Sequence, residues 1–418
     1  MIEVINKLLE LKQKSFDIEK DKREVASLYE MLVNVHPSRD EYIVECEKFI
    51  QKLNVNDVSD SEEKDWLQMT MNHLGASLAV MIFEKKPSIT DNEFECMLKY
   101  FRDGWIDKEV ASCGIYALSQ LLNIIHPMTC YQLVKEAFTV NPDLGGILGV
   151  EGYKFEGAAA EEHITEACPF CGEKENILPY YCSAQIMKLK NRNVFPPAKL
   201  WMKCECCDNY YTYNFPLFNV DYINGHYTSA QREESRLENK FSLKYYSRIF
   251  NQIKEYTNGK DYLEIGVGTG EMLAVAMEFG YNVEAVEICK EDCERISKVL
   301  NVNIHCSDIV DFEPERKYDV IIMGDVFEHV TAPVNVLKKA CAMLNEGGVL
   351  WLSTPNYNCG YARLQGFSHA MWHELNHYTY SSYESVCKIL DKLGMEVVHY
   401  DVSERYMGSM ELFIRKTD

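Results

Sequence analysis

Residues 261–270 read DYLEIGVGTG, and this stretch decides the fold of the C-terminal part of the chain. Its first half is a short apolar run of the kind that predicts a buried β-strand, and the pattern of residues 271–279 predicts a helix. Glycines between a strand and a helix let the backbone come close to a ligand at the carboxyl end of the strand. The stretch therefore predicts a ligand-binding turn at the edge of an α/β sheet.

The acid before the turn distinguishes it from a dinucleotide-binding turn. The glycines have the spacing Gly-x-Gly-x-Gly, and Glu264 lies two residues before the first of them. A carboxylate there would repel a pyrophosphate, whereas it would attract a cationic sulfonium that carries an α-amino group. The alternative is that Glu264 only compensates the positive N-terminal end of the following helix.

Two further acids follow predicted strands. Strand and helix patterns alternate from residue 261 to the C-terminus, which is typical of a mostly parallel sheet. The strand predicted at residues 282–287 ends in Glu287, and a carboxylate at that place can accept hydrogen bonds from both hydroxyls of a ribose. Asp308 follows the strand predicted at residues 303–306. It could bind an adenine amino group or be a plain turn residue.

Taken together, these residues resemble the class I methyltransferases that use S-adenosylmethionine. The resemblance is carried by residues 264–270, Glu287, Asp308, residues 319–330, and the helix, glycine pair and strand predicted over residues 333–356. Their order is similar to the branch of ubiquinone-biosynthesis and sugar O-methyltransferases. The resemblance covers residues 256–418, and its motifs are specific for the cofactor but not for the acceptor.

The resemblance implies a Rossmann-like, seven-stranded sheet that ends in an antiparallel strand pair, here residues 395–401 and 409–415. It implies S-adenosyl-L-methionine as the cofactor, with Glu264 near the methionine moiety, Asp308 near the adenine and Asp325 beside the transferred methyl group. The cofactor-binding residues that we carry over are Glu264, Gly266, Gly268, Gly270, Glu287, Asp308, Asp325 and Val326.

Histidines are the candidate catalytic residues, because methyl transfer to oxygen or nitrogen often requires the removal of a proton. His329 follows the fourth predicted strand, and His373 and His377 lie in the segment 372–378. On a helix, the latter two would share one face and could hold a second metal ion. The alternative is that His329 makes a structural hydrogen bond and that His377 only packs or caps a helix.

Two Cys-x-x-Cys units predict a metal site in the segment before the sheet. Cys168, Cys171, Cys204 and Cys207 offer four thiolates, which suit a tetrahedral, closed and therefore structural Zn²⁺ site. The alternatives are a set of buried free thiols, or a ligand set in which Cys206 or Cys182 replaces one member. Sixteen cysteines in a chain without a secretion signal indicate reduced thiols and metal ligands.

The composition divides the chain into four predicted parts. Residues 1–160 have helical spacing and predict an all-α domain, and residues 161–215 predict a small zinc-ribbon-like module. Residues 216–255 are expected to form a helical linker or lid, and residues 256–418 the methyltransferase domain. The predicted fold class is therefore α/β at the C-terminus, preceded by an all-α domain and the zinc module.

Charge and hydropathy limit the classes of partner that we expect for this chain. The chain carries 43 Lys and Arg against 64 Asp and Glu, a net charge of -21. An acidic protein repels phosphate groups, so nucleic acid and anionic membranes are disfavoured as partners. We see neither a signal peptide nor an apolar run long enough to span a membrane, and we expect a cytoplasmic protein. Oligomerisation through the helical domain stays open.

We expect a methyltransferase that acts on an oxygen or nitrogen of a small-molecule acceptor of the sugar or natural-product type. Transfer to carbon is a weaker variant. One alternative is a protein or peptide methyltransferase whose helical and zinc modules dock the substrate, and an acidic surface would favour a basic one. Another is a non-catalytic scaffold that senses the cofactor, since fold does not determine function.

Overall fold

The computed structural model describes residues 2–13, 27, 28, 31, 60–155, 162–184, 189, 195–216 and 241–417. The chain divides into two compact units, one formed by residues 1–161 and 179–200 and the other by residues 162–178 and 201–418. The four-part division expected from composition stays a prediction. Most of the expected lid, residues 217–240, lies outside the described residues.

The described residues of the first unit up to residue 155 are organised as helices, which confirms the predicted helical character of the N-terminal part. Its helices are α1 (Ile2–Gln13), α4 (Asp60–Lys85), α5 (Asp91–Phe101), α6 (Lys108–Ser119), α7 (Pro127–Val140) and α8 (Leu144–Ile147). Local sequence explains where they begin: Thr90 and Glu93 form a capping box at α5, and Pro127 opens α7. Buried Leu74, Phe101 and Phe138 form part of the core.

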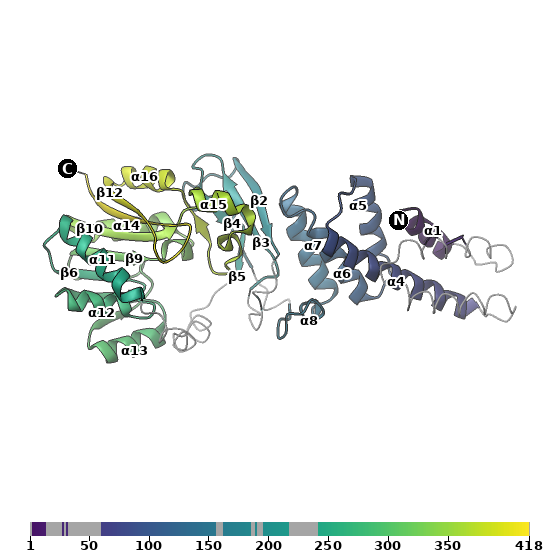
Figure 1. Cartoon of the computed structure of the whole chain (residues 1–418), viewed down its shortest axis with the longest axis horizontal. Coiled ribbons are helices and arrows are strands. Elements are labelled where there is room, and N and C mark those ends of the chain that lie inside the picture. The colour runs from purple at the N-terminus through teal and green to yellow at the C-terminus, as the bar shows by residue number, and fades with distance from the viewer. Residues whose placement is uncertain are drawn as a thin grey trace. The chain divides into compact units, whose positions relative to one another are not determined.

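A seven-stranded sheet organises the second unit and confirms the predicted Rossmann-like fold class (Figure 1). Its strands are β6 (Asp261–Ile265), β7 (Asn282–Glu287), β8 (Asn303–Cys306), β9 (Tyr318–Gly324), β10 (Leu344–Pro355), β12 (Met395–Val402) and β13 (Ser409–Lys416). Their order is β12-β13-β10-β9-β6-β7-β8, and β13 pairs antiparallel with both neighbours, whereas the other pairs are parallel.

Helices cover both faces of this sheet. Figure 1 shows α11 (Phe241–Tyr256), α12 (Glu271–Glu278) and α13 (Lys290–Leu300) on one side, and α14 (Pro333–Ala342) and α16 (Tyr383–Lys392) on the other. Side chains alternate across a strand, so Tyr262 and Ile322 join the core beneath α11, while Leu263 and Ile321 are buried on the opposite face. The parallel strands end together at one edge, where the loops carry the predicted site residues.

A smaller sheet carries the cysteine segment. Its order is β11-β4-β3-β2, formed by β2 (Ile177–Ser183), β3 (Lys199–Cys204), β4 (Tyr210–Thr212) and β11 (Thr379–Tyr380). β1 (Glu162–Ile164) pairs separately with β5 (Asn214–Pro216). Trp201 stacks on Tyr380 with ring centroids 4.6 Å apart, and its indole N–H donates to the carbonyl of Trp372 at 3.0 Å.

β11 was not expected from the sequence, and it ties the cysteine segment to the chain after β10. That stretch also contains α15 (Gly360–Gln365) and the 3₁₀ turns η3 (Gly366–Ser368) and η4 (Ala370–His373). A further turn, η2 (Phe327–His329), follows β9. The backbone N–H of Tyr378 donates to the carbonyl of Glu328 at 2.7 Å, so β11 is held against η2.

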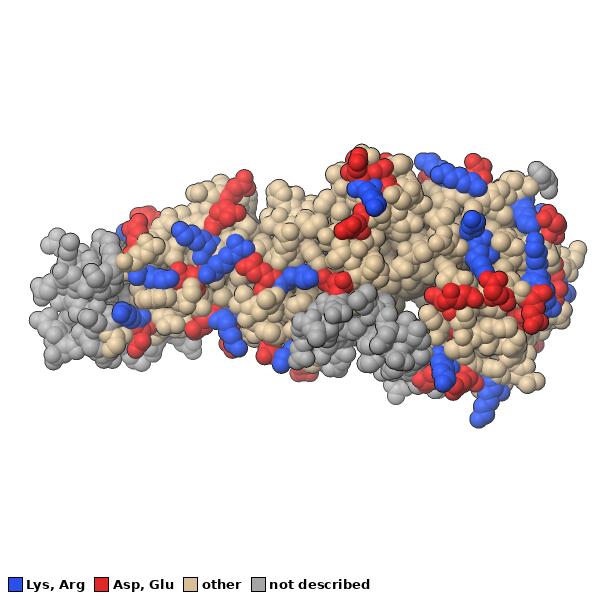
Figure 2. All heavy atoms as spheres, turned by 180° about the vertical axis from the view of Figure 1, so that it is seen from behind, with Lys and Arg blue, Asp and Glu red and all other residues tan. Residues whose placement is uncertain are grey.

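Acidic and basic side chains are interspersed on the face of the molecule drawn in Figure 2. The negative net charge of the whole chain is therefore not gathered into one continuous acidic field on that face. Within the described part of the chain, no helix combines the length and the apolar character that crossing a membrane requires.

Candidate functional site

The turn between β6 and α12 is shaped by its glycines. Gly266 and Gly268 have φ values of +77° and +49°, a left-handed region that favours glycine. A Cβ atom on Gly266 would lie 2.6 Å from Cγ2 of Val326, so the two loops can approach only because glycine is there. The backbone N–H of Gly270 donates to the carbonyl of Val267 at 2.8 Å and closes the turn.

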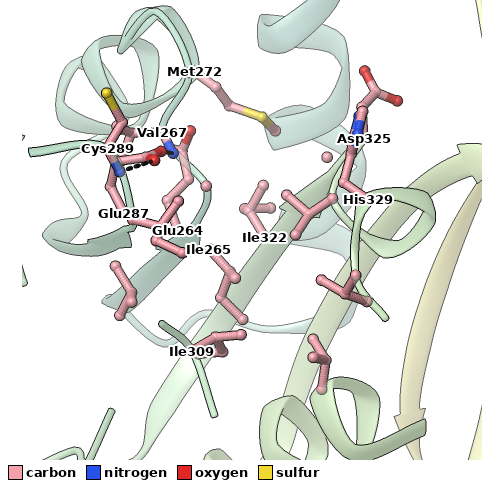
Figure 3. Close-up of a pocket in the computed structure, with 18 of the residues that line it drawn as sticks. Glu264, Ile265, Val267, Met272, Glu287, Cys289, Ile309, Ile322, Asp325 and His329 are labelled. Atoms are coloured by element: carbon pink, nitrogen blue, oxygen red, sulfur yellow. Dashed lines mark hydrogen bonds between the residues drawn. The ribbon is translucent and has the colours of Figure 1, made fainter. Parts of the chain in front are cut away.

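A cavity of about 1560 Å³ opens at this edge of the sheet. Among the residues that line it are those at the ends of the parallel strands, and Figure 3 shows several of them pointing toward a common space. Of the predicted cofactor residues, the lining includes Glu264, Gly266, Gly268, Glu287, Asp308, Asp325 and Val326, and Gly270 borders the same turn.

Glu264 is a buried carboxyl group at the end of β6. It is 4% exposed, and its Oε2 accepts a hydrogen bond from the hydroxyl of Tyr262 at 2.8 Å. Burial raises the pKa of Glu264 to about 8, although the bond from Tyr262 opposes the shift. A cationic group that enters the cavity would stabilise the ionised form of this carboxyl group.

Glu287 is held rigidly at the end of β7. Its Oε2 accepts the backbone N–H of Val267 at 2.9 Å, and its Oε1 accepts that of Cys289 at 2.8 Å (Figure 3). Burial raises the pKa of Glu287, and these two bonds counteract the shift. Each carboxylate oxygen can still accept a second hydrogen bond, which is what a pair of ribose hydroxyls would require.

Asp308 lines the cavity and also stabilises its own turn, because its Oδ1 accepts the backbone N–H of Val310 at 3.0 Å. The two interpretations of this residue are therefore compatible. Asp325, after β9, has a φ of +55° and accepts a hydrogen bond from the Ser353 hydroxyl at 3.0 Å. Burial raises the pKa of Asp325.

His329 is the one of the three predicted catalytic histidines that lines the cavity. Its Nδ1 lies 2.8 Å from the carbonyl oxygen of Asn376. Because a carbonyl only accepts, Nδ1 carries the proton in this contact, and the neutral ring has its lone pair on Nε2. That is the arrangement of a histidine able to accept a proton.

His377 lies beside His329, with ring centroids 4.6 Å apart at an angle of 85°. Its Nδ1 is 2.7 Å from the hydroxyl of Tyr380, which itself donates to the carbonyl of Met371. Ligand atoms of Glu328, His329 and His377 lie within 4.8 Å of one another. The third member, Glu328, is buried and accepts the hydroxyl of Thr354 at 3.0 Å.

His373 lies apart from this group. It is buried, and its Nε2 is 2.9 Å from the carbonyl oxygen of Phe367. The turn η4 ends at His373, so His373 and His377 do not share a helical face as a helix through both would require. The structure therefore does not pair these two histidines at one site.

The four predicted cysteine ligands converge. The sulfur atoms of Cys168, Cys171, Cys204 and Cys207 lie within 4.8 Å of one another. Two of the sulfur pairs are 3.5 and 3.6 Å apart, close to the ~3.8 Å between ligands of a tetrahedral ion with ~2.3 Å bonds.

The two cysteine turns have the same hydrogen bonding. Gly172 N–H donates to the carbonyl of Cys168, as Asp208 N–H does to that of Cys204, and both donors have positive φ. The match aligns Cys207 with Cys171 and leaves Cys206 exposed. A hydrogen bond from Cys168 lowers the pKa of the Cys207 thiol to about 5, against burial and with support from Asn209.

Residues outside the predicted cofactor-binding and catalytic sets form a further wall of the cavity. They are Lys244, Tyr245, Tyr246 and Arg248 on α11, and Arg405 and Tyr406 in the turn between β12 and β13. Arg248 also contacts Glu411 of β13 at 2.8 Å, which anchors α11 to the sheet. The only sequence signal was the aromatic character of residues 241–246, which fits a core helix equally well.

Comparisons with known proteins find matches to this same C-terminal part of the chain. Residues 237–400 match a methyltransferase domain family. The ubiquinone biosynthesis O-methyltransferase of Coxiella burnetii (strain RSA 493 / Nine Mile phase I) is 31% identical over 108 residues, which are 24% of this chain and 45% of that protein. The enzyme of the same description from Actinobacillus pleuropneumoniae serotype 7 is 28% identical over 109 residues, or 23% and 47%.

The chain thus spans about half the length of the curated relatives that it matches. Among solved structures, magnesium protoporphyrin IX methyltransferase from Synechocystis PCC 6803 is similar over 48% of this chain and 100% of its own, with 16% identity and a TM-score of 0.38. The family match and the order of the seven strands both indicate a methyltransferase fold for this part of the chain. The C-terminal part of this chain is therefore a class I S-adenosylmethionine-dependent methyltransferase domain.

Proposed function

We propose that this protein binds S-adenosyl-L-methionine in the cavity at the ends of β6, β7 and β9 and transfers its methyl group to an oxygen or nitrogen of a small-molecule acceptor. The observation that carries the proposal is Glu287, a half-buried carboxylate fixed by two backbone N–H groups beside the glycine turn. A position so constrained suits the recognition of a ribose diol.

Different residues around the cavity would bind different parts of the cofactor. Glu264 would face the α-amino group, Glu287 the ribose and Asp308 the adenine, while Gly266 and Gly268 let the backbone lie against the ligand. When bound, the cofactor supplies an activated methyl group on a sulfonium. Asp325 and Val326 line the same cavity and border the place where that group would lie.

His329 is our candidate for the general base. It lines the cavity, and its contact with Asn376 places the neutral ring's lone pair on Nε2. A base in this position would take the proton from an acceptor hydroxyl or amine as the new bond forms. We assign His377 as a positioning residue, because its ring packs edge-on against that of His329.

The cysteine cluster would hold one structural Zn²⁺. Four sulfur ligands at tetrahedral spacing leave no open position for a substrate, so no catalytic step is assigned to the ion. Its effect on the site would be mechanical. Phe170, between two of the ligands, packs edge-on against Phe327 of η2 at 6.3 Å, one turn from His329.

The cofactor proposal is tested by titrating S-adenosylmethionine calorimetrically into the zinc-loaded protein and its Glu287→Ala variant. We expect binding in the micromolar range that weakens at least tenfold in the variant, a loss of about 1.4 kcal/mol from one charged hydrogen-bond acceptor. Glu291→Ala is the matched control, because Glu291 is an exposed acid in the first turn of α13 outside the cavity. It should bind like the wild type.

Transfer is tested next, by following S-adenosylhomocysteine formation with a panel of small phenols, alcohols and amines. Cofactor binding without transfer to any small molecule or to basic peptides would favour the scaffold alternative. Failure of the folded wild-type protein to bind the cofactor would overturn the proposal.

A further inference from the structure

The cavity is lined by both acidic and basic side chains. The acids Glu264, Glu287 and Asp308 lie at the ends of β6, β7 and β8, where the cofactor is proposed to bind. The cations come from other elements: Lys244 and Arg248 belong to α11, and Arg405 to the turn between β12 and β13, where the acid Glu404 also lines the cavity. For an anionic group of a ligand, these three cations are the lysine and arginine partners that the described lining offers.

Arg248 is engaged in holding the wall together. Its guanidinium contacts Glu411 at 2.8 Å and Asp401 at 3.0 Å, and Glu404 lies 3.8 Å away. Glu411 is fully buried, so this group serves an internal charge first. It is a poor candidate for recognising a ligand.

Arg405 is placed differently. Its Nη1 donates to the hydroxyl of Tyr246 at 2.9 Å, and its guanidinium carbon lies 4.9 Å from the ring centroid of Tyr406 and 6.0 Å from that of Tyr246. Its ion pair with Asp325 is long, at 3.9 Å. Within the described residues these contacts use a minority of its five N–H donors. The guanidinium is thus oriented by tyrosines while most of its donors stay available.

The position of Arg405 relates it to the reacting atoms. Asp325 borders the proposed site of the methyl group, so a ligand held by Arg405 has an atom within reach of that site. The surrounding surface is aromatic, since Tyr245, Tyr246, Tyr378 and Tyr406 line the same cavity. A planar guanidinium binds a carboxylate through two parallel hydrogen bonds, and tyrosine rings pack against a planar ligand.

From this arrangement we infer that the acceptor is an aromatic compound with a carboxylate, and that Arg405 is the residue that selects for it. The inference rests on the proposed function and specifies the substrate class of the same site. The carboxylate pairs with the guanidinium, the ring lies among the tyrosines, and the hydroxyl or amine to be methylated faces Asp325 and His329.

The test compares two probes that differ in one charged group, 4-hydroxyphenylacetate and its alcohol analogue tyrosol. Each is titrated into protein saturated with S-adenosylhomocysteine. The wild type should bind the acid at least about tenfold more tightly than the alcohol, as a charge-assisted pair predicts. In Arg405→Gln the two probes should bind alike, while the affinity for S-adenosylhomocysteine changes by less than about twofold.

Arg363→Gln is the matched control, because Arg363 is an exposed arginine on α15 outside the cavity lining. It should keep the preference for the acid. Equal binding of the two probes by the wild type, or binding of neither, would overturn the inference. A loss of S-adenosylhomocysteine affinity in Arg405→Gln equal to the loss for the acid would assign Arg405 to the cofactor's own carboxylate instead. Failure of the wild type to bind S-adenosylhomocysteine would refute the proposed function itself.

Discussion

The buried carboxyl group of Glu264 predicts that cofactor binding releases a proton at neutral pH. Burial raises the pKa of Glu264 to about 8, so about nine-tenths of the molecules carry a proton on this group at pH 7. The α-amino group of the cofactor is cationic and would be bound by the carboxylate. Binding must then lower the pKa of Glu264 well below 7 and expel the proton.

The magnitude follows from the same value. With S-adenosylhomocysteine as the ligand, Glu264 should contribute a release of about 0.9 proton per site at pH 7 and about 0.1 at pH 9, where the carboxylate already exists; any proton that the ligand's own amino group takes up is common to wild type and variant. The Glu264→Gln variant keeps the side-chain volume and can still accept the hydroxyl of Tyr262, but it has no proton to release. The difference between wild type and variant therefore isolates this group from Glu287 and Asp325, whose pKa values burial also raises.

The assay is calorimetric titration in two buffers whose ionisation enthalpies differ widely. The dependence of the observed heat on the buffer gives the number of protons released. We expect a clear wild-type dependence at pH 7 that is absent in Glu264→Gln. Equal buffer dependence in the two proteins would refute the assignment of Glu264 to the amino group, even if the ligand binds.

Three further substitutions test the proposed base, the zinc ligands and the hydrogen bonding of Glu411. His329→Gln should slow methyl transfer by about 100-fold or more while S-adenosylhomocysteine affinity stays within about twofold, and an unchanged transfer rate would exclude it as the base. Cys207→Ser should abolish the one zinc ion per chain measured with a colorimetric chelator and lower the melting temperature, whereas Cys206→Ser should do neither; zinc loss in both variants would contradict the assigned ligand set. Tyr245→Phe removes one of the two hydrogen bonds to fully buried Glu411 and should destabilise the C-terminal unit by about 1–3 kcal/mol in urea unfolding, while no change would show that the bond is dispensable.

Much of the cofactor side could be predicted because its residues are local to strand ends. The period of residues 261–265 and the glycines after them place Glu264 at the end of β6. Glu287 occupies the same place on β7, and in a parallel sheet such ends meet at one edge. The positions of these two acids follow from the local sequence pattern of each strand and from the rule that parallel strands run in the same direction.

The wall formed by α11 and the turn between β12 and β13 could not be predicted, because it depends on contacts between residues that are far apart in the sequence. Arg405 and Tyr246 are 159 positions apart and meet only after β12 and β13 have folded back along β10. Spacing likewise favours Cys207 as the ligand but leaves Cys206 as an alternative. The positive φ of Asp208, which matches that of Gly172, aligns Cys207 with Cys171.

The histidines show a limit of a different kind. The four-residue spacing of His373 and His377 places them on one face only if a helix runs through both, but the turn η4 ends at His373. The partner of His377 is His329, 48 positions away in the chain and brought close by the bond between Tyr378 and Glu328. Such a pairing follows from tertiary structure alone.

A crystal structure of the protein with S-adenosylhomocysteine would test the proposed cofactor site directly. In that structure we expect the ribose hydroxyls within hydrogen-bonding distance of the Glu287 carboxylate, the amino group at Glu264, and the sulfur facing Asp325 and His329. A ligand bound elsewhere, or one in this cavity without contact to Glu287, would contradict it.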